Sequence, residues 1–157
     1  MRYALQRRYS GARCLGLSEE IIRLHYDIND EDFSAAGEAS SGVKKTLSAL
    51  GVSPETVKKV AIAMYEAEIN AVIHADGGEA DIEITPEEIK VVISDRGPGI
   101  PDMEKAMEPG YSTATETVRE LGFGAGMGLP NMKRYTDEMY IDTKLGEGTT
   151  VTLIVKI

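Results

Sequence analysis

The fold is decided by the segment SPETVKKVAIAMYEAEINAVIHADGG, residues 53–78. A capping serine followed by proline is a helix-start signal, and the closing glycine pair ends the helix near Ala75. Apolar residues recur in two stripes along this helix, the first formed by Val57, Val60, Met64, Ala67 and Ala71 and the second by Ile62, Tyr65, Ile69 and Val72. A helix that is apolar on two sides is mostly buried. We therefore predict a central helix inside the protein.

Sequence patterns on either side of this helix predict further helices and a set of neighbouring strands. Period-two alternation predicts two strand pairs joined by short turns, and a loosely alternating run predicts an edge strand before the helices. The predicted strands are 21–28, 80–84, 89–93, 139–143 and 149–157, and the other predicted helices are about 33–50 and 129–136. Strands that are mostly adjacent in sequence indicate an α+β two-layer sandwich, with helices packed on one face of a mainly antiparallel sheet.

Length and charge restrict the possible classes of protein. The 157 residues suit one domain, which we place at 21–157, with residues 1–20 as an N-terminal arm or edge strand. The net charge of -9 makes nucleic acid an unfavourable partner. No apolar run is long enough for a membrane span or a signal core, and the single cysteine excludes an internal disulfide. These features predict a cytoplasmic protein.

A carboxylate and an amide share one face of the predicted central helix. Glu66 and Asn70 are four residues apart, in apolar surroundings where polar groups need partners. An amide oxygen suits magnesium, and a carboxylate can accept a proton from an attacking hydroxyl. The alternatives are a solvated helix face or a buried pair satisfied by backbone groups. Glu68 lies more than half a turn away from Glu66, and we expect it to be an ordinary charged residue.

Two glycine-containing segments follow the strands. Asp95 ends a predicted strand, where it can accept a hydrogen bond from an exocyclic amine such as that of adenine, and Gly97 and Gly99 let backbone approach a flat ring. A plain turn is the alternative. Alternating glycines from Gly122 to Gly128, just before a helix, can present amide donors to an anion, with a flexible hinge as the alternative.

Other nucleotide and metal motifs are absent. The chain has no G-x-x-x-x-G-K-[ST] loop and no G-x-G-x-x-G fingerprint before a helix. His25 and His74 are far apart and lack cysteines or carboxylates at metal-binding spacing, so we expect no zinc site.

Four motifs, in this order, resemble the ATPase superfamily of DNA gyrase, the large heat-shock chaperones, histidine kinases and mismatch-repair ATPases. The motifs are Glu66-x-x-x-Asn70, Asp95-x-Gly97-x-Gly99, Gly124-x-Gly126-Met127-Gly128-Leu129 and Gly148-Thr149-Thr150. Within the superfamily, small size and the form Glu-x-x-x-Asn-Ala-x-x-His look most like the bacterial anti-sigma factor serine kinases. The segment from Glu108 to Thr113 and the long glycine tract look closer to the lid of a histidine kinase.

The resemblance implies the Bergerat-type ATP-binding fold and a role for each matched residue. It implies that Glu66 is the general base, Asn70 the Mg²⁺ ligand and Asp95 the adenine-binding residue, under a mobile lid between Ile100 and Gly124. The full set of predicted ATP-binding residues is Asn70, Asp95, Gly97, Gly99, Ile100, Ser112, Thr113, Gly124, Ala125, Gly126, Met127, Gly128, Leu129 and Thr149.

Two functions follow from the resemblance. The first is an ATP-dependent protein serine/threonine kinase that also sequesters a regulatory partner of the sigma factor or anti-sigma antagonist type. The second is a nucleotide-gated binding module, or a histidine-kinase-like ATPase subunit, with little or no kinase activity. Glu66 favours the kinase, because pure binding needs no base, whereas the lid composition favours the module. A homodimer is compatible with either function.

Overall fold

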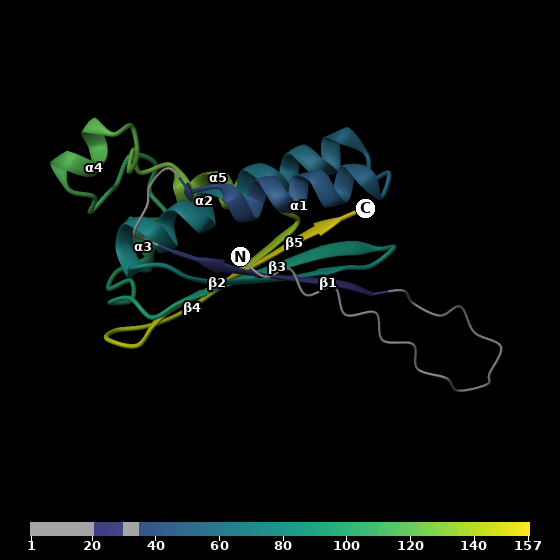
Figure 1. Ribbon diagram of the computed structural model, residues 1–157. Coiled ribbons are helices and arrows are strands. Elements are labelled where there is room, and N and C mark those ends of the chain that lie inside the picture. Colours follow the sequence, from purple (N-terminus) through teal and green to yellow (C-terminus); the bar gives the residue numbers. More distant parts are fainter. Residues whose placement is uncertain (1–20, 30–34) are drawn as a thin grey trace.

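The computed structural model describes residues 21–29 and 35–157, which form two layers. Five antiparallel strands lie in the order β1-β2-β3-β5-β4, and helices α1, α2 and α5 cover one face of this sheet (Figure 1). The strands are β1 (Ile22–Ile28), β2 (Gly78–Ile84), β3 (Glu88–Asp95), β4 (Glu138–Lys144) and β5 (Gly148–Lys156). The helices are α1 (Glu38–Ala49), α2 (Pro54–Ala75), α3 (Met103–Ala106), α4 (Glu116–Glu120) and α5 (Gly128–Tyr135). The predicted α+β sandwich is confirmed, and the predicted N-terminal arm lies outside the described residues.

Helix α2 follows its sequence signals closely. The Ser53 hydroxyl accepts a hydrogen bond from the Thr56 N–H at 3.2 Å, and Pro54 occupies the first turn. The helix ends at Ala75, and its C-cap residue Asp76 is left-handed with φ 54°, as is the following Gly77 with φ 91°. All members of the first apolar stripe are buried, whereas the second stripe includes the exposed Tyr65. The prediction of a mostly buried central helix is therefore correct for one full face of α2.

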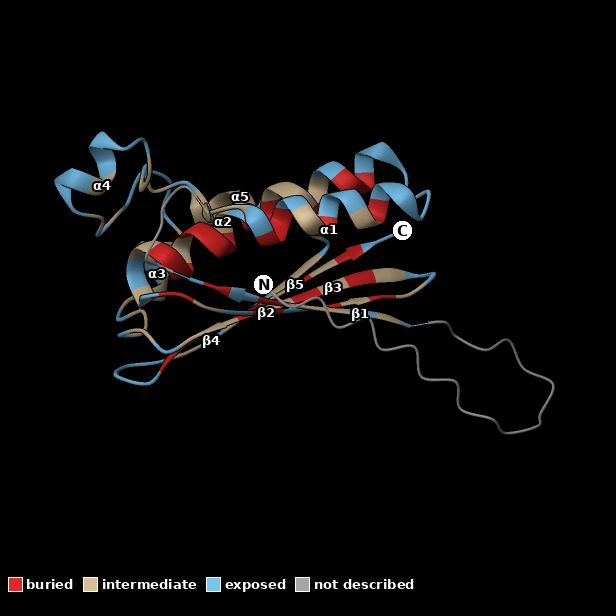
Figure 2. Cartoon of the chain, viewed as in Figure 1, coloured by how far each residue is buried: buried red, intermediate tan, exposed pale blue. Residues whose placement is uncertain are grey.

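The core lies between the helices and the inner face of the sheet (Figure 2). Strand residues alternate, so that Ile82, Val91 and Leu153 point inward from paired positions on three neighbouring strands. Each such side chain, once fully buried, contributes about 1.5–3 kcal/mol relative to exposure. The outer face of the sheet is polar and open to solvent, as alternation in an antiparallel sheet predicts.

The start of α1 differs from the prediction. The helix begins at Glu38 rather than near Phe33, which lies outside the described residues, and its N-cap Gly37 makes no side-chain cap. Its first N–H groups are satisfied by Glu68 of α2 instead. The Glu68 carboxylate accepts hydrogen bonds from the N–H groups of Gly37 at 3.0 Å, Ala39 at 3.1 Å and Ser40 at 2.9 Å.

Glu68 is therefore a structural anchor, and the prediction of an ordinary charged residue is wrong. Its side chain is buried, with 2% exposure. A buried carboxylate needs donors, and the first turn of a helix offers unpaired N–H groups together with a favourable dipole. Helical period alone does not show that α1 covers this side of α2.

The segment between β3 and α5 is only partly irregular. It contains α3 and α4, two short helices capped by Asp102 and Thr115, which the sequence analysis did not predict. No residue from 96 to 128 is buried. This segment therefore has no core of its own. Within the described residues, no helix has both the length and the apolar character needed to cross a membrane.

Candidate functional site

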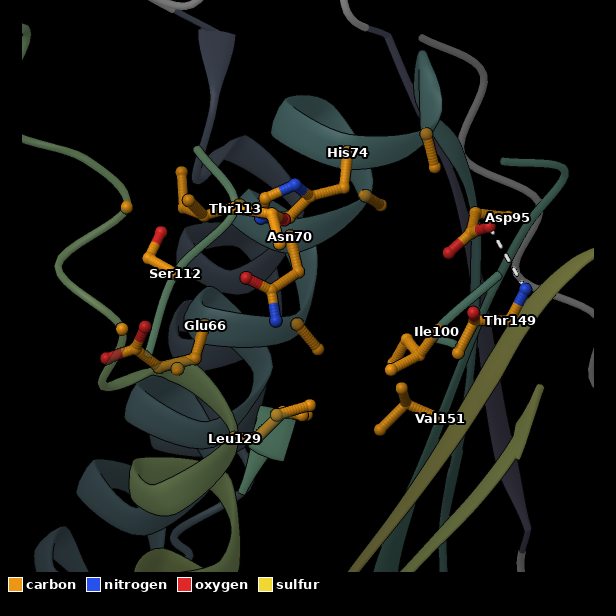
Figure 3. Close-up of a pocket in the computed structure, with 18 of the residues that line it drawn as sticks. Glu66, Asn70, His74, Asp95, Ile100, Ser112, Thr113, Leu129, Thr149 and Val151 are labelled. Carbon is orange, nitrogen blue, oxygen red and sulfur yellow. Dashed lines mark hydrogen bonds between the residues drawn. The ribbon is translucent and has the colours of Figure 1, made fainter. Parts of the chain in front are cut away.

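A cavity of about 410 Å³ lies between α2 and the sheet, beneath the segment that joins β3 to α5. Glu66, Asn70 and His74 line it from α2, whereas Asp95 and Thr149 line the opposite wall from the ends of β3 and β5 (Figure 3). Every ATP-binding residue predicted from the sequence lines this cavity except Gly97. The structure thus brings together side chains that are more than 80 positions apart in the sequence.

Asp95 is held by two backbone donors. One carboxylate oxygen, Oδ1, accepts hydrogen bonds from the N–H groups of Gly97 at 2.9 Å and Thr149 at 3.1 Å. The second oxygen points into the cavity (Figure 3). Because two fixed donors orient this carboxylate, it presents a single acceptor in a defined direction to whatever binds.

The two glycines after Asp95 serve close packing of the chain on itself. A Cβ at Gly97 would lie 2.5 Å from the Ala75 Cβ, and one at Gly99 would lie 2.6 Å from the Lys144 carbonyl oxygen. Gly99 also has a left-handed φ of 76°. In the structure, Gly97 thus packs closely against α2, and Gly99 packs closely against the β4–β5 turn. This packing fixes the wall of the cavity next to Asp95.

A threonine pair connects Asp95 with the start of the segment above the cavity. The Thr143 hydroxyl accepts a hydrogen bond from the Ile100 N–H at 2.8 Å and lies 2.9 Å from the Thr149 hydroxyl. Thr149 in turn donates its N–H to Asp95. Sequence reasoning missed Thr143, although a polar residue at an inward position of β4 was an available signal.

The first turn of α5 contacts both polar side chains of the α2 pair. The Asn131 Nδ2 donates a hydrogen bond to the Glu66 Oε1 at 2.7 Å. Gly128 leaves room for Asn70, because a Cβ there would lie 3.2 Å from both terminal atoms of the Asn70 amide. Asn131 was not predicted, and no sequence signal distinguishes it from an ordinary helix-surface asparagine. The first turn of α5, which follows the glycine tract, thus packs against Glu66 and Asn70.

The segment above the cavity holds its shape mainly through backbone packing. The Ser112 hydroxyl accepts the Ala114 N–H at 3.1 Å, and the Arg119 guanidinium donates to the Ser112 carbonyl at 3.0 Å. Gly124 and Gly126 are left-handed, and a Cβ on Gly126 would collide with the backbone of Gly110. These glycines therefore let two parts of this segment pack closely together. Ser112 and Thr113 both line the cavity.

The charges around the cavity are unusual for an anion site. Its lining includes the carboxylates Glu66, Asp95 and Asp102 but, among the described residues, no lysine or arginine. Among the lining residues that the structure describes, His74 is the one basic side chain that titrates. The pKa of His74 is lowered below 6.5 because the concave site partly desolvates its ring, although much of the ring is solvent-accessible, and the Asp95 carboxylate opposes this shift. A bound anion must therefore be balanced by backbone N–H groups or by a cation that accompanies it.

Comparison with known proteins finds a matching family for the chain. A family model described as a histidine kinase-like ATPase domain matches residues 31–155. The serine/threonine-protein kinase RsbT of Bacillus subtilis (strain 168) is 33% identical over 127 residues, covering 78% of this chain and 87% of that protein. An anti-sigma F factor of Geobacillus stearothermophilus is 30% identical over 131 residues, covering 77% of this chain and 86% of that protein.

A solved structure agrees in fold. The crystal structure of the RsbU and RsbW domains of a Mycobacterium tuberculosis protein matches with a TM-score of 0.59 and 18% identity. The match covers 85% of this chain and 32% of that one. At this level of identity, the likeness supports the two-layer architecture described above.

Proposed function

Because the chain belongs to the histidine kinase-like ATPase family, we propose that its cavity binds ATP and that the protein is an anti-sigma-factor-type serine/threonine kinase. Two relatives named as a serine/threonine kinase and an anti-sigma factor support this proposal. The observation that carries it is the placement of Glu66 and Asp95 on opposite walls of one cavity (Figure 3). The Asp95 carboxylate, suited to bind adenine, and the Glu66 carboxylate, suited to accept a proton, can therefore act on the same ATP molecule.

We assign adenine recognition to Asp95. Its cavity-facing oxygen is an acceptor for the exocyclic amine of adenine, whereas guanine presents a keto oxygen at that position and offers it no donor. Ile100, Leu129 and Val151 supply apolar surface nearby for the ring (Figure 3). This mixture of apolar walls and one oriented polar group is typical of small-molecule sites.

We assign the Mg²⁺ that accompanies ATP to Asn70. Its amide lines the cavity, and Gly128 leaves the space beside it free of a side chain. One amide oxygen, with phosphate and water oxygens completing the set, fits a cation that keeps several waters. The part of the chain that the structure describes contributes no lysine or arginine to the lining, which is consistent with this assignment, since the metal would supply positive charge beside the phosphates.

Glu66 is the proposed general base. In phosphoryl transfer, the hydroxyl oxygen of a serine or threonine forms a bond to the terminal phosphorus as the bond to the ADP oxygen breaks. The proton of that hydroxyl passes to the Glu66 carboxylate. Ser112 and Thr113 lie on the same side of the cavity as Glu66 (Figure 3), and we expect them to contact the terminal phosphate.

The proposed acceptor belongs to another protein, a regulator of the sigma factor or anti-sigma antagonist class. We expect this partner to dock beside the open lid, near Arg119 and α1. We assign residues 21–157 to the ATP-binding domain and place its activity in the cytoplasm. The net charge of -9 favours a partner with a basic or apolar docking surface. ATP should change partner affinity, and the partner should change ATP affinity by the same factor.

Calorimetry with ATP and GTP tests the nucleotide assignment. Asp95→Asn keeps an oxygen for the two backbone donors but turns an amine toward the cavity, so ATP affinity should fall about ten- to hundred-fold, equivalent to about 1–3 kcal/mol. Asp102→Asn is the matched control, because Asp102 lines the cavity but its carboxylate caps α3. Equal affinity for ATP and GTP in the natural protein would refute the assignment of Asp95.

Phosphate transfer from labelled ATP to a co-purified protein tests the kinase itself. Glu66→Gln should still bind ATP while transfer to serine or threonine falls about 10²–10⁴-fold. Partner binding that responds to ATP without any transfer would instead support the nucleotide-gated binding module. Light scattering of the same samples shows whether two copies of the chain associate.

A further inference from the structure

We propose that Asn131 is a positioning residue, which holds one oxygen of the Glu66 carboxylate and thereby directs the other toward the reacting hydroxyl. The inference rests on the proposed function, because it assigns to Asn131 a role in the work of the base. Its basis is the 2.7 Å hydrogen bond from the Asn131 Nδ2 to the Glu66 Oε1, which joins α5 to α2 at the wall of the cavity.

Glu66 needs a fixed partner to work as a base. A glutamate side chain has several rotatable bonds, and holding it in one rotamer costs conformational entropy. Glu66 lies at a half-buried position on the wall opposite Asp95 (Figure 3). A hydrogen bond to a charged acceptor is shorter and stronger than a neutral one, so it can select that rotamer. The oxygen that Asn131 does not hold is left to face the ligand.

Asn131 is well placed to act as that partner. It lies in the first turn of α5, between the buried residues Leu129 and Met132, which fix this helix against the core. Its own N–H donates to the Met127 carbonyl at 2.9 Å, so the backbone beneath the side chain is helical and ordered. A short amide on a packed helix turn is a more rigid donor than a long cationic side chain.

The chemistry of an amide also suits the role. A lysine or arginine in this place would form an ion pair that favours the charged carboxylate, and this would make Glu66 a weaker base. An amide N–H orients the carboxylate without placing a positive charge beside it. The same turn of α5 places Gly128 against Asn70, so one short helical segment contacts both the proposed base and the proposed metal ligand.

Steady-state ATP turnover separates positioning from a merely structural contact. The enzyme is the full chain with saturating Mg²⁺ and ATP, and the acceptor is water or the co-purified protein. Asn131→Ala and the similarly sized, apolar Asn131→Leu both remove the donor without adding a charge, and each should lower kcat about ten- to hundred-fold. The ATP dissociation constant should stay within about twofold in both variants, because Asn131 is not among the residues that line the cavity. Lys133→Ala, an exposed change on the same helix, is the control and should alter neither value.

The double variant gives the decisive result. If Asn131 acts only through Glu66, then Glu66→Gln combined with Asn131→Ala should be no slower than Glu66→Gln alone. Losses that multiply, or normal turnover in Asn131→Ala, would overturn the inference and leave the kinase proposal intact. An equal fall in turnover and ATP affinity in Asn131→Ala would also overturn it. Normal turnover in Glu66→Gln, or no turnover in the natural protein with any acceptor, would instead remove the proposed function and this inference together.

Discussion

Replacing Glu68 by alanine should destabilise the protein more than any other single change to a charged residue of α2. The substitution removes the acceptor of three N–H groups at the start of α1, those of Gly37, Ala39 and Ser40. Each buried donor left without a partner costs about 1–3 kcal/mol. Part of that sum is recovered when water reaches the opened helix end, so we expect a net loss of about 3–5 kcal/mol, as for other broken buried charge contacts.

Urea denaturation followed by far-ultraviolet circular dichroism measures this loss directly. For a chain of this size, about 3–5 kcal/mol corresponds to a fall in Tm of roughly 10 °C or more. Glu68→Gln keeps one oxygen for two of the donors but turns an amine toward the third, so it should lose about half as much free energy of unfolding. Glu55→Gln is the matched control, because Glu55 is an exposed residue of the same helix in an ion pair with Lys59, which contributes at most about 0.5 kcal/mol.

The reasoning is refuted if the free energy of unfolding of Glu68→Ala lies within about 1 kcal/mol of the value for the natural protein. In that case, the start of α1 is held by apolar packing, and the three hydrogen bonds are readily replaced by water. Amide exchange in α1 gives a second measurement. Exchange at Ala39 and Ser40 should accelerate in Glu68→Ala more than exchange at the other end of the helix.

Two further predictions concern histidines and glycines. In an NMR titration, His25 should titrate above pH 6.5 because of its 2.8 Å hydrogen bond to Asp81, whereas His74 should titrate below pH 6.5 because its site desolvates the ring. Because folding raises the pKa of His25, the stabilising contribution of this residue is complete below pH 6.5 and is lost as the pH rises through the folded-state pKa. His25→Gln should therefore flatten that part of the curve of stability against pH. Shifts of both histidine pKa values in the same direction would contradict this pair of assignments. Gly148→Ala should cost about 3 kcal/mol or more, because its Cβ would collide with the Asp95 carbonyl, whereas Gly146→Ala, with open space around it, should cost only the left-handed strain of about 1–2 kcal/mol. Equal denaturation midpoints for the two glycine variants would show that the collision is relieved by a backbone shift.

The sequence was sufficient to predict elements whose pattern is local. The Ser53-Pro54 start of α2, its buried stripe and the two strand hairpins follow from period and turn chemistry, and the structure confirms them. The resemblance of four spaced motifs then predicted which residues gather around the cavity. Of the predicted ATP-binding residues, only Gly97 does not line the cavity, because it packs against Ala75 instead.

Polar residues with distant partners could not be predicted in this way. Glu68, Asn131 and Thr143 have no local signature, because their roles depend on which element lies opposite them in space. Helical spacing separated Glu68 from Glu66 correctly, but it could not reveal that α1 begins above Glu68. The short helices α3 and α4 were missed for a different reason. They bury no residue, so they leave no periodic apolar pattern to detect.

The anchoring of α1 by Glu68 also bears on how this protein can change during evolution. All three donors are main-chain N–H groups, so substitutions at Ala39 or Ser40 other than proline leave the donors in place, provided that the new side chains fit the core. We therefore expect Glu68 to be conserved during evolution while the side chains at Ala39 and Ser40 vary. Methods that infer contacts from correlated substitutions would find no correlated pair here, although the Glu68 side chain is buried. In aligned relatives, the expected trace of this helix junction is one invariant acid on α2 facing a variable first turn of α1.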